Sequence, residues 1–175
     1  MRRRQLLKFG LLGTAGVAVG GFVWLRNGKP DRPLTIEASL QVLRELQQLK
    51  LSSTGNWSPF QIFSHLAQSV EYSMQGFPQS KSPWIQNTVG SLAFHAFSAA
   101  GNMKHALDEV IPGAPLIKTE GDAQLAITRL SNALKDFEAF SGSLKPHFMY
   151  GDLSKSQYTL AHILHVNNHL VEIKG

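Results

Sequence analysis

The amino-acid sequence predicts an all-α fold, built as a bundle of helices. Apolar residues recur at steps of three and four over most of the chain, which is the period of an amphipathic helix. Two helix-start motifs place a capping serine three residues before a glutamine, Ser58 with Gln61 and Ser154 with Gln157. No run of about four to eight residues alternates apolar and polar side chains with β-branched enrichment, so no strand is predicted.

Five helices are expected in chain order. They cover about 35–49, Ser58 to about Gly76, Ser82 to about Gly101, about 122–140, and Ser154 to Leu170. Proline follows the capping serine of the second and third helices, at the first helical position that tolerates it. The apolar pattern of the first helix includes Leu49, and that of the third includes Val89 and Leu92. In the fourth helix, the residues expected to face inward are Leu125, Leu130, Leu134 and Phe137. The 175 residues suffice for one such core.

The basic charge of the chain is concentrated at its N-terminus. The formal net charge is +5, and residues 1–29 contain six Lys and Arg residues and no acidic residue. The rest of the chain has 11 basic and 12 acidic residues, so it has no basic excess with which to bind phosphates. The charge pattern therefore argues against a nucleic-acid partner.

The sequence contains no cysteine. Disulfides, thiolate catalysis and cysteine-based zinc sites are therefore excluded. Any metal ion must be held by histidine, carboxylate, carbonyl or water ligands.

Residues 1–29 are predicted to be a twin-arginine export signal. Residues 3–8, Arg-Arg-Gln-Leu-Leu-Lys, resemble the twin-arginine consensus, with Leu6 where phenylalanine is commonest. A glycine- and alanine-diluted apolar run follows from Phe9 to Leu25. An ordinary Sec signal or a membrane anchor is the alternative. Twin-arginine export carries folded proteins, often with a cofactor already loaded, so the translocase is an expected partner.

The sequence divides into this N-terminal segment and a helical domain over residues 30–175. Ala18 and Gly20 offer a cleavage site, but the apolar run continues beyond them. The 17 residues from Phe9 to Leu25 are at the lower limit for spanning a bilayer. The expected location is periplasmic or otherwise extracytoplasmic, with release and anchoring to the inner membrane both open.

The last expected helix carries three of the seven histidines. His165 and His169 are four residues apart, so their imidazoles lie on one face of a helix, one turn apart. That spacing suits two ligands of one metal ion. His65, at the edge of the apolar stripe of the second helix, is the best candidate for a third ligand, because bundle metal sites use side chains of facing helices. Hydrogen-bonded core histidines are the alternative interpretation.

His162 lies on the same face, about one turn before His165. It could replace His169 as a ligand, or lie beside the metal as a proton shuttle or substrate contact. Glu172 could accept a hydrogen bond from a ligand imidazole or be a solvated residue. Three other histidines are expected to be structural or on the surface: His95, His105 and His147. Of these, His147 is the strongest candidate for a role in the site, because its loop leads into the last helix.

Several segments resemble a DinB-like family of unknown function. Residues 57–67, Trp-Ser-Pro-Phe-Gln-Ile-Phe-Ser-His-Leu-Ala, and residues 73–78, Ser-Met-Gln-Gly-Phe-Pro, resemble its second-helix signature. Residues 111–115, Ile-Pro-Gly-Ala-Pro, are similar to the loop after its third helix, and residues 153–170 resemble its closing helix. The resemblance covers roughly residues 34–173. It implies the DinB/YfiT-like four-helix bundle with additional short helical segments packed around it.

The resemblance also implies a metal site. In that superfamily, one histidine of the second helix and two on the last helix bind a divalent metal, which by position gives His65, His165 and His169. His162 then becomes a neighbour of the metal and the candidate for acid–base catalysis. Two features depart from the family pattern: Asn168, where a further histidine is expected, and the order Pro-His-Phe in residues 146–148.

Characterised relatives include transferases and isomerases that use low-molecular-weight thiols. These thiols are cytoplasmic, so export of this chain would favour hydrolysis or an unknown reaction. The expected function is therefore an exported, divalent-metal-binding hydrolase or transferase that uses Zn, Ni, Fe or Mn and an unidentified small-molecule substrate. The alternatives are a non-catalytic metal-binding or interaction module of the cell envelope and a bundle whose histidines fill polar niches. A homodimer stays open.

Overall fold

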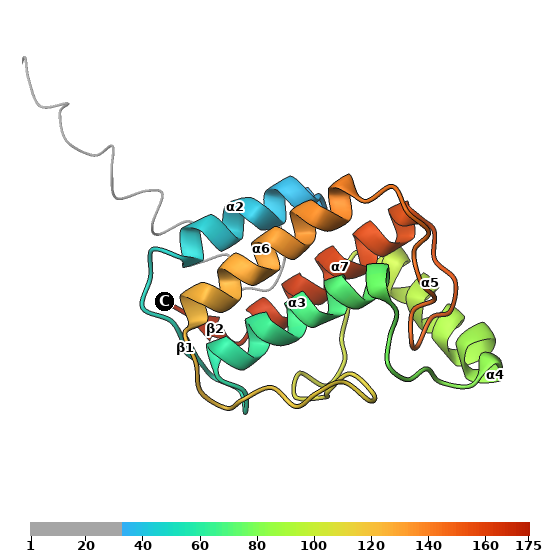
Figure 1. The fold of residues 1–175 in the computed structure, drawn as a ribbon, viewed down its shortest axis with the longest axis horizontal. Helices are drawn as coiled ribbons and strands as arrows, with labels where there is room; N and C mark the ends of the chain where they lie inside the picture. The colour runs from blue at the N-terminus through green and yellow to red at the C-terminus, as the bar shows by residue number, and fades with distance from the viewer. Residues whose placement is uncertain (1–32) are drawn as a thin grey trace, which may run out of the picture.

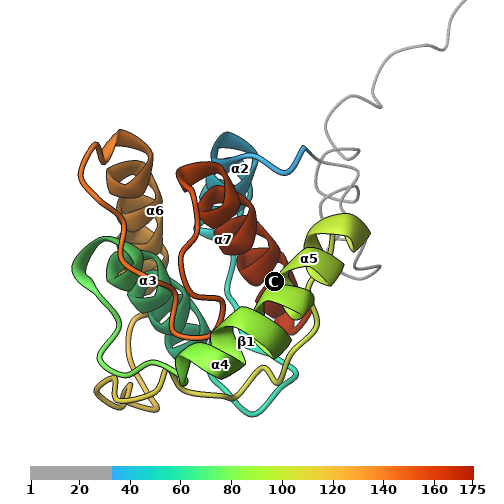
Figure 2. The same ribbon diagram turned by 90° about the vertical axis from the view of Figure 1, so that its right-hand side faces the viewer.

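Four long helices run side by side through the molecule (Figure 1). The structure is a computed structural model that describes residues 33–175. The four helices are α2 (Ile36–Leu46), α3 (Pro59–Gln75), α6 (Ala123–Ala139) and α7 (Lys155–Leu170). Turned by 90°, they are seen nearly end-on, with α5 lying outside them next to α7 (Figure 2). The prediction of an all-α fold with a four-helix bundle is confirmed.

Capping residues fix where the two helices of the site begin. Ser58 Oγ accepts the backbone N–H of Gln61 at 3.2 Å, and Gln61 Oε1 accepts that of Ser58 at 3.1 Å. Ser154 and Gln157 form the same reciprocal pair at the start of α7. Each pair satisfies amide protons that have no partner within the helix. The predicted starts of both helices are confirmed.

The third expected helix is a helical segment in three parts. The short α4 (Pro83–Ile85) leads into a π-helical turn, η1 (Gln86–Gly90), and then into α5 (Ser91–Ala100). A Cβ at Gly90 would overlap the carbonyl oxygen of Met149, because the loop before α7 packs directly on the helix backbone here. Only glycine permits that approach.

This segment buries fewer apolar side chains than the sequence suggests. Phe94 is buried, but Val89 and Leu92 are exposed, Leu92 at 73%. Neither side chain joins the core, because the segment lies outside the bundle, where α7 is the bundle helix that it packs against most.

Two strands of two residues each join the ends of the bundle. β1 (Ser52–Ser53) pairs antiparallel with β2 (Ile173–Lys174). The prediction of no strand is wrong at this point, because two-residue strands are too short to show alternation. The pairing fixes the chain after α7 to the loop between α2 and α3.

The core lies between the four bundle helices, and α3 and α6 make the most extensive contact. Ala126, Ile127 and Leu130 are buried on α6, whereas Leu125 is 68% exposed. Leu125 precedes Leu130 by five residues, which on a helix is a different face, so its predicted burial is wrong. Leu49 is also exposed, because α2 ends before it at Leu46.

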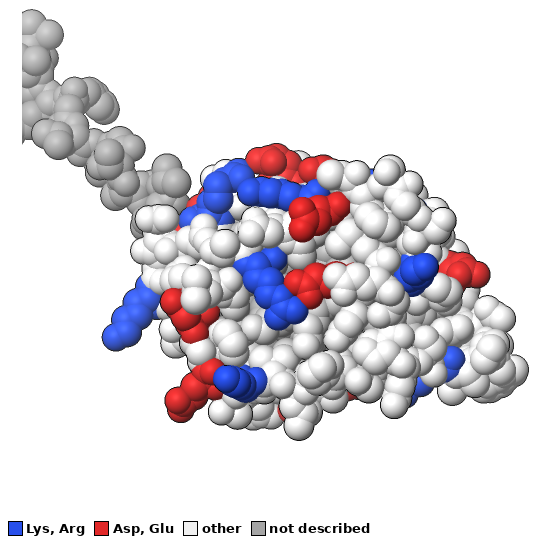
Figure 3. Space-filling model, in the orientation of Figure 1, with Lys and Arg blue, Asp and Glu red and all other residues white. Residues whose placement is uncertain are grey.

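Basic and acidic side chains alternate over the face shown in Figure 3, without a continuous basic area. Arg129 forms a two-pronged ion pair with Glu71, and Arg44 pairs with Glu37. The predicted export signal, residues 1–29, lies outside the described residues. Within residues 33–175, no helix combines the length and the apolarity that crossing a bilayer requires.

Candidate metal centre

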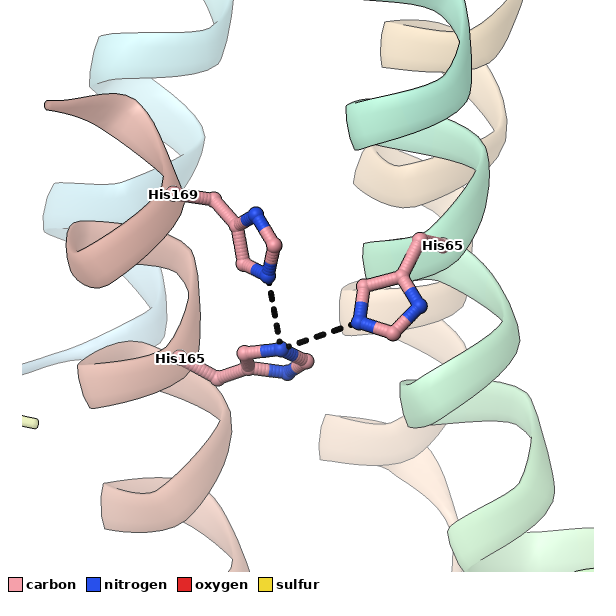
Figure 4. A group of neighbouring side chains, drawn as sticks. All are labelled: His65, His165 and His169. Carbon is pink, nitrogen blue, oxygen red and sulfur yellow. Dashed lines mark hydrogen bonds between the residues drawn. The ribbon is translucent and has the colours of Figure 1, made fainter. Parts of the chain in front are cut away.

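The three predicted ligands meet between α3 and α7 (Figure 4). His165 Nε2 lies 3.2 Å from His65 Nε2 and 3.1 Å from His169 Nε2. One nitrogen of each ring can be chosen so that all three lie within 4.8 Å of one another. His65 comes from α3, and the other two lie one turn apart on α7. The structure therefore brings together the residues that the sequence predicts, and we refer to them as the histidine trio.

Trp57, the residue before the α3 cap, packs against the trio. Its ring centroid lies 5.0 Å from that of His65 in an edge-to-face arrangement. It lies 6.2 Å from that of His169, with the two ring planes within 7° of parallel. The indole restricts the rotation of both imidazoles and covers this side of the trio with apolar surface.

Burial keeps the trio neutral. Burial lowers the pKa of His65 to about 4, and the neighbouring His105 adds to the effect. Burial also lowers the pKa of His169 to about 2, and it lowers the pKa of His165 well below its ordinary value. Neutral imidazole is the form that binds a metal ion, so at neutral pH these rings can bind one without first losing a proton.

The donor set of the trio fits one shared metal ion. A neutral imidazole nitrogen carries either a proton or a lone pair, so three mutually facing Nε2 atoms cannot all be satisfied by one another. The Nδ1 atoms of His65 and His169 are buried and have no hydrogen-bond partner among residues 33–175. Nitrogens about 2.0–2.1 Å from one ion stand roughly 2.8–3.4 Å apart at right-angled or tetrahedral positions. The two closest separations in the trio match that range.

A cavity of about 380 Å³ adjoins the trio. His65 and His165 line it, and Phe97 and Met103 contribute apolar wall. A volume of this size suits a small molecule. The trio is therefore reached from a space in which a ligand could lie beside two of its rings.

His162 lines the same cavity and is buried. The Ser73 hydroxyl donates to the Val70 carbonyl at 2.6 Å, so its oxygen is left to accept from His162 Nε2 at 3.2 Å. That bond puts the proton of the ring on Nε2 and the lone pair on Nδ1. Burial lowers the pKa of His162 to about 3. His162 is thus a neighbour of the trio and stands outside the convergent set of nitrogens.

The loop before α7 puts His147 into the wall of the cavity. Its Nδ1 accepts the backbone N–H groups of Met149 at 3.1 Å and Tyr150 at 3.2 Å. The proton of the ring therefore lies on Nε2, which becomes a fixed donor. Burial lowers the pKa of His147 to about 3, with His162 adding to the effect. His147 is a neutral hydrogen-bond donor in the cavity wall.

His105 also lies against the trio, although sequence patterns give no sign of it. Its ring centroid is 5.0 Å from that of His165 and 5.4 Å from that of His169. It lies in the long connection between α5 and α6, which has no regular secondary structure and hence no periodicity to interpret. Its position beside the trio was not expected from the sequence, which predicts only a structural or surface role for it. His95 is exposed on α5, as expected.

A protein-family model matches residues 29–174, and its description is protein of unknown function, DUF1569. The chain belongs to the DUF1569 family. DUF1569 is a DinB-like fold family, so the resemblance to a DinB-like family of unknown function is confirmed. No curated protein and no solved structure matches the chain.

Glu172 does not support a ligand imidazole in this DUF1569 chain. Its Oε2 and the Nδ1 of His169 both lack a hydrogen-bond partner within residues 33–175. The carboxylate packs against Gly55, where a Cβ would overlap it. Burial, and then the charge of Asp108, raise the pKa of Glu172. Of the two roles open for Glu172, the hydrogen bond to a ligand imidazole is not formed.

Two residues that the sequence resemblance sets apart lie on α7 and in the loop before it. Asn168 precedes His169 on α7, and its Nδ2 is buried without a partner among the described residues. His147 lies in the cavity wall. Neither residue belongs to the convergent set of nitrogens that the trio forms.

Proposed function

We propose that the chain is a divalent-metal-dependent enzyme, a hydrolase or a transferase, that acts on a small molecule in the cavity. One observation carries the proposal: His65 and His165 belong both to the convergent trio and to the cavity wall. A donor set of three imidazoles leaves coordination positions for a substrate. The ion, Zn, Ni, Fe or Mn, would supply Lewis-acid chemistry when bound.

His162 is the residue that we assign to proton transfer. Its Nε2 proton is held by Ser73, so Nδ1 is the atom that can accept a proton. Since the pKa of the ring is lowered to about 3, His162 is neutral at the start of a reaction and releases an accepted proton readily. His147 would orient a substrate oxygen through its fixed Nε2–H.

Charged groups at the cavity suit a substrate with a polar end. Lys81 and Glu109 line the cavity, and both are exposed to solvent. Phe97 and Met103 form part of its apolar wall. A molecule with one apolar portion and one charged or strongly polar group fits this lining best.

Metal analysis of the purified protein tests the trio. We expect about one divalent ion per chain, and we expect His65→Ala and His169→Ala to lose it because each removes one of three ligands. His95→Ala, on the exposed side of α5, is the matched control and should keep its metal. Only trace metal in the wild type, with no rise in unfolding temperature on adding Zn²⁺, Ni²⁺, Fe²⁺ or Mn²⁺, would contradict the proposal.

A non-catalytic metal-binding module is the second candidate, favoured by the nearness of His105 to the trio. A ligand set completed by protein would leave less room for a substrate. A panel of ester, amide and thiol-transfer substrates separates the two functions. A metal-dependent rate that His162→Ala reduces at unchanged metal content supports the enzyme, whereas metal binding without turnover supports the module.

We further propose that residues 1–29 direct the folded chain out of the cytoplasm through the twin-arginine translocase. The support is the motif in residues 3–8 and the apolar run after it. Cell fractionation should find the chain in the periplasm or on the inner membrane. The double variant Arg3→Lys, Arg4→Lys should stay in the cytoplasm, and an unchanged distribution would refute this route.

A further inference from the structure

Four imidazoles, and not three, gather between α3 and α7. Within the trio, the ring centroids lie 4.8, 5.0 and 5.1 Å apart. The ring of His105 lies 5.0 Å from that of His165 and 5.4 Å from that of His169. The ring of His105 is therefore within 0.6 Å of the spacing that separates His165 from His169.

The hydrogen bonding of His105 prepares it to bind a metal. Its Nδ1 lies 2.7 Å from the Ala106 carbonyl oxygen, which can only accept, so Nδ1 carries the proton. The lone pair is therefore on Nε2, the nitrogen with no hydrogen-bond partner among residues 33–175. A backbone carbonyl on the far nitrogen is the arrangement that fixes metal-binding histidines in the ligating tautomer.

The loop that carries His105 is held over the trio at both sides of this residue. Met103 is buried and lines the cavity. Asp108 accepts a hydrogen bond at 2.8 Å from Asn56, which lies on the loop before α3. His105 itself is half-buried and belongs to no helix or strand, so a local shift of the backbone can move its ring without disturbing the bundle.

We propose that His105 is a fourth, exchangeable ligand of the metal ion held by His65, His165 and His169. The proposal rests on the proposed function, because it needs the trio to bind a metal. The nitrogens of His105 do not belong to the convergent set of the trio, so this ligand joins when its residue and Ala106 shift together toward the trio, which keeps the Nδ1 hydrogen bond.

A fourth imidazole narrows the choice of metal. A tetrahedral ion such as Zn²⁺ would be closed by four imidazoles, whereas an ion that takes five or six ligands keeps positions for a substrate. Fe²⁺, Ni²⁺ and Mn²⁺ then suit a catalytic role, and Zn²⁺ holds the site shut unless His105 leaves.

Cobalt binding by the purified full chain tests the role of His105. Co²⁺ is the probe, because its visible absorption reports the number and the geometry of its ligands. We expect His105→Ala and His105→Gln to bind Co²⁺ at least about 10-fold more weakly than wild type and to change the absorption bands. His95→Ala is the control and should match the wild type in both respects.

The outcomes separate this inference from the proposed function. If both His105 variants bind Co²⁺ with the affinity and the spectrum of the wild type, His105 is not a ligand. The proposal that the trio binds a metal is then unaffected. Failure of the wild type to bind Co²⁺, with binding of no other divalent ion, overturns both. Matching circular dichroism and unfolding temperature of the metal-free variants show that any loss arises at the site.

Discussion

His147 has a buried imidazole ring in which one nitrogen accepts hydrogen bonds and the other carries the proton. Nδ1 accepts two backbone N–H groups of its own loop, and that loop packs on Gly90. Burial, and then the nearby His162, lower the pKa of this ring, so the folded chain holds it neutral. A proton on Nδ1 would also break both hydrogen bonds. The loop therefore depends on the protonation state of one side chain.

The free energy of unfolding should fall as the pH drops below about 6.5. The pKa of His147 is about 3 in the folded chain, so between these values the unfolded chain binds a proton that the folded chain does not. The contribution of His147 is complete above about pH 6.5, and its loss is at most about 1.4 kcal/mol per pH unit. Urea unfolding of wild type and His147→Asn, at neutral and mildly acid pH, measures it. We expect the variant to show the shallower slope, and identical slopes would count against this role.

At the scale of single residues, the sequence predicts the trio because each member lies on a periodic helix. The spacing of His165 and His169 needs only the geometry of α7, and His65 needs only the apolar stripe of α3. His105 and Trp57 escape this reasoning, because their positions depend on irregular segments whose path no local pattern determines. The hydrogen bond considered for Glu172 is absent for a related reason, since α7 ends at Leu170 and the chain leaves the helix path.

The helices follow their local signals closely, and the exception is the π-helical turn η1. The N-terminal caps of α3 and α7 are each formed by a serine and the glutamine three residues later, so the sequence alone locates them. The π turn instead lies where Gly90 meets the backbone of Met149, a contact between segments far apart in the sequence. π turns of this kind are frequent near functional sites, and Met149, which contacts Gly90, lines the cavity.

Gly90→Ala should destabilise the protein by about 1–3 kcal/mol, because the added methyl group overlaps a backbone oxygen that cannot rotate away. Gly101→Ala is the matched control: it lies at the end of α5 with φ +64° and open space around its Cα. Gly101→Ala should lower the free energy of unfolding by only about 1–2 kcal/mol, because alanine is strained in the left-handed conformation of this residue. Urea unfolding compares them, and Gly90→Ala should also reduce Co²⁺ or substrate access through the displaced loop. A stability equal to wild type would refute the close contact.

At the scale of the whole molecule, the contact between α3 and α6 is the most extensive in the bundle. Periodicity is enough to predict an all-α fold and the number of main helices, because each helix carries its own apolar stripe. It does not give the order in which the helices surround the core, or the β1–β2 pairing, since both arise from contacts between distant segments. The proposed export signal in residues 1–29 rests on a sequence motif, and these residues lie outside the part of the chain that the structure describes.

Leu130→Ala should lower the free energy of unfolding by about 2–5 kcal/mol, because the side chain is fully buried between α6 and its neighbours. Leu125→Ala, on the same helix and 68% exposed, should change it by about 0.5 kcal/mol or less. Urea unfolding of the two variants distinguishes the core face of α6 from its outer face. Similar losses would mean that α6 is rotated from the orientation described.

The contact between His65 and His165 joins positions 100 residues apart in the chain. A bound ion would therefore act as a removable cross-link that closes most of the domain into a loop. Because it binds the folded chain in preference to the unfolded one, the folded fraction would rise with the concentration of free metal. In a cell short of that metal, more of the chain would be exposed to proteases, and its abundance would follow the metal supply.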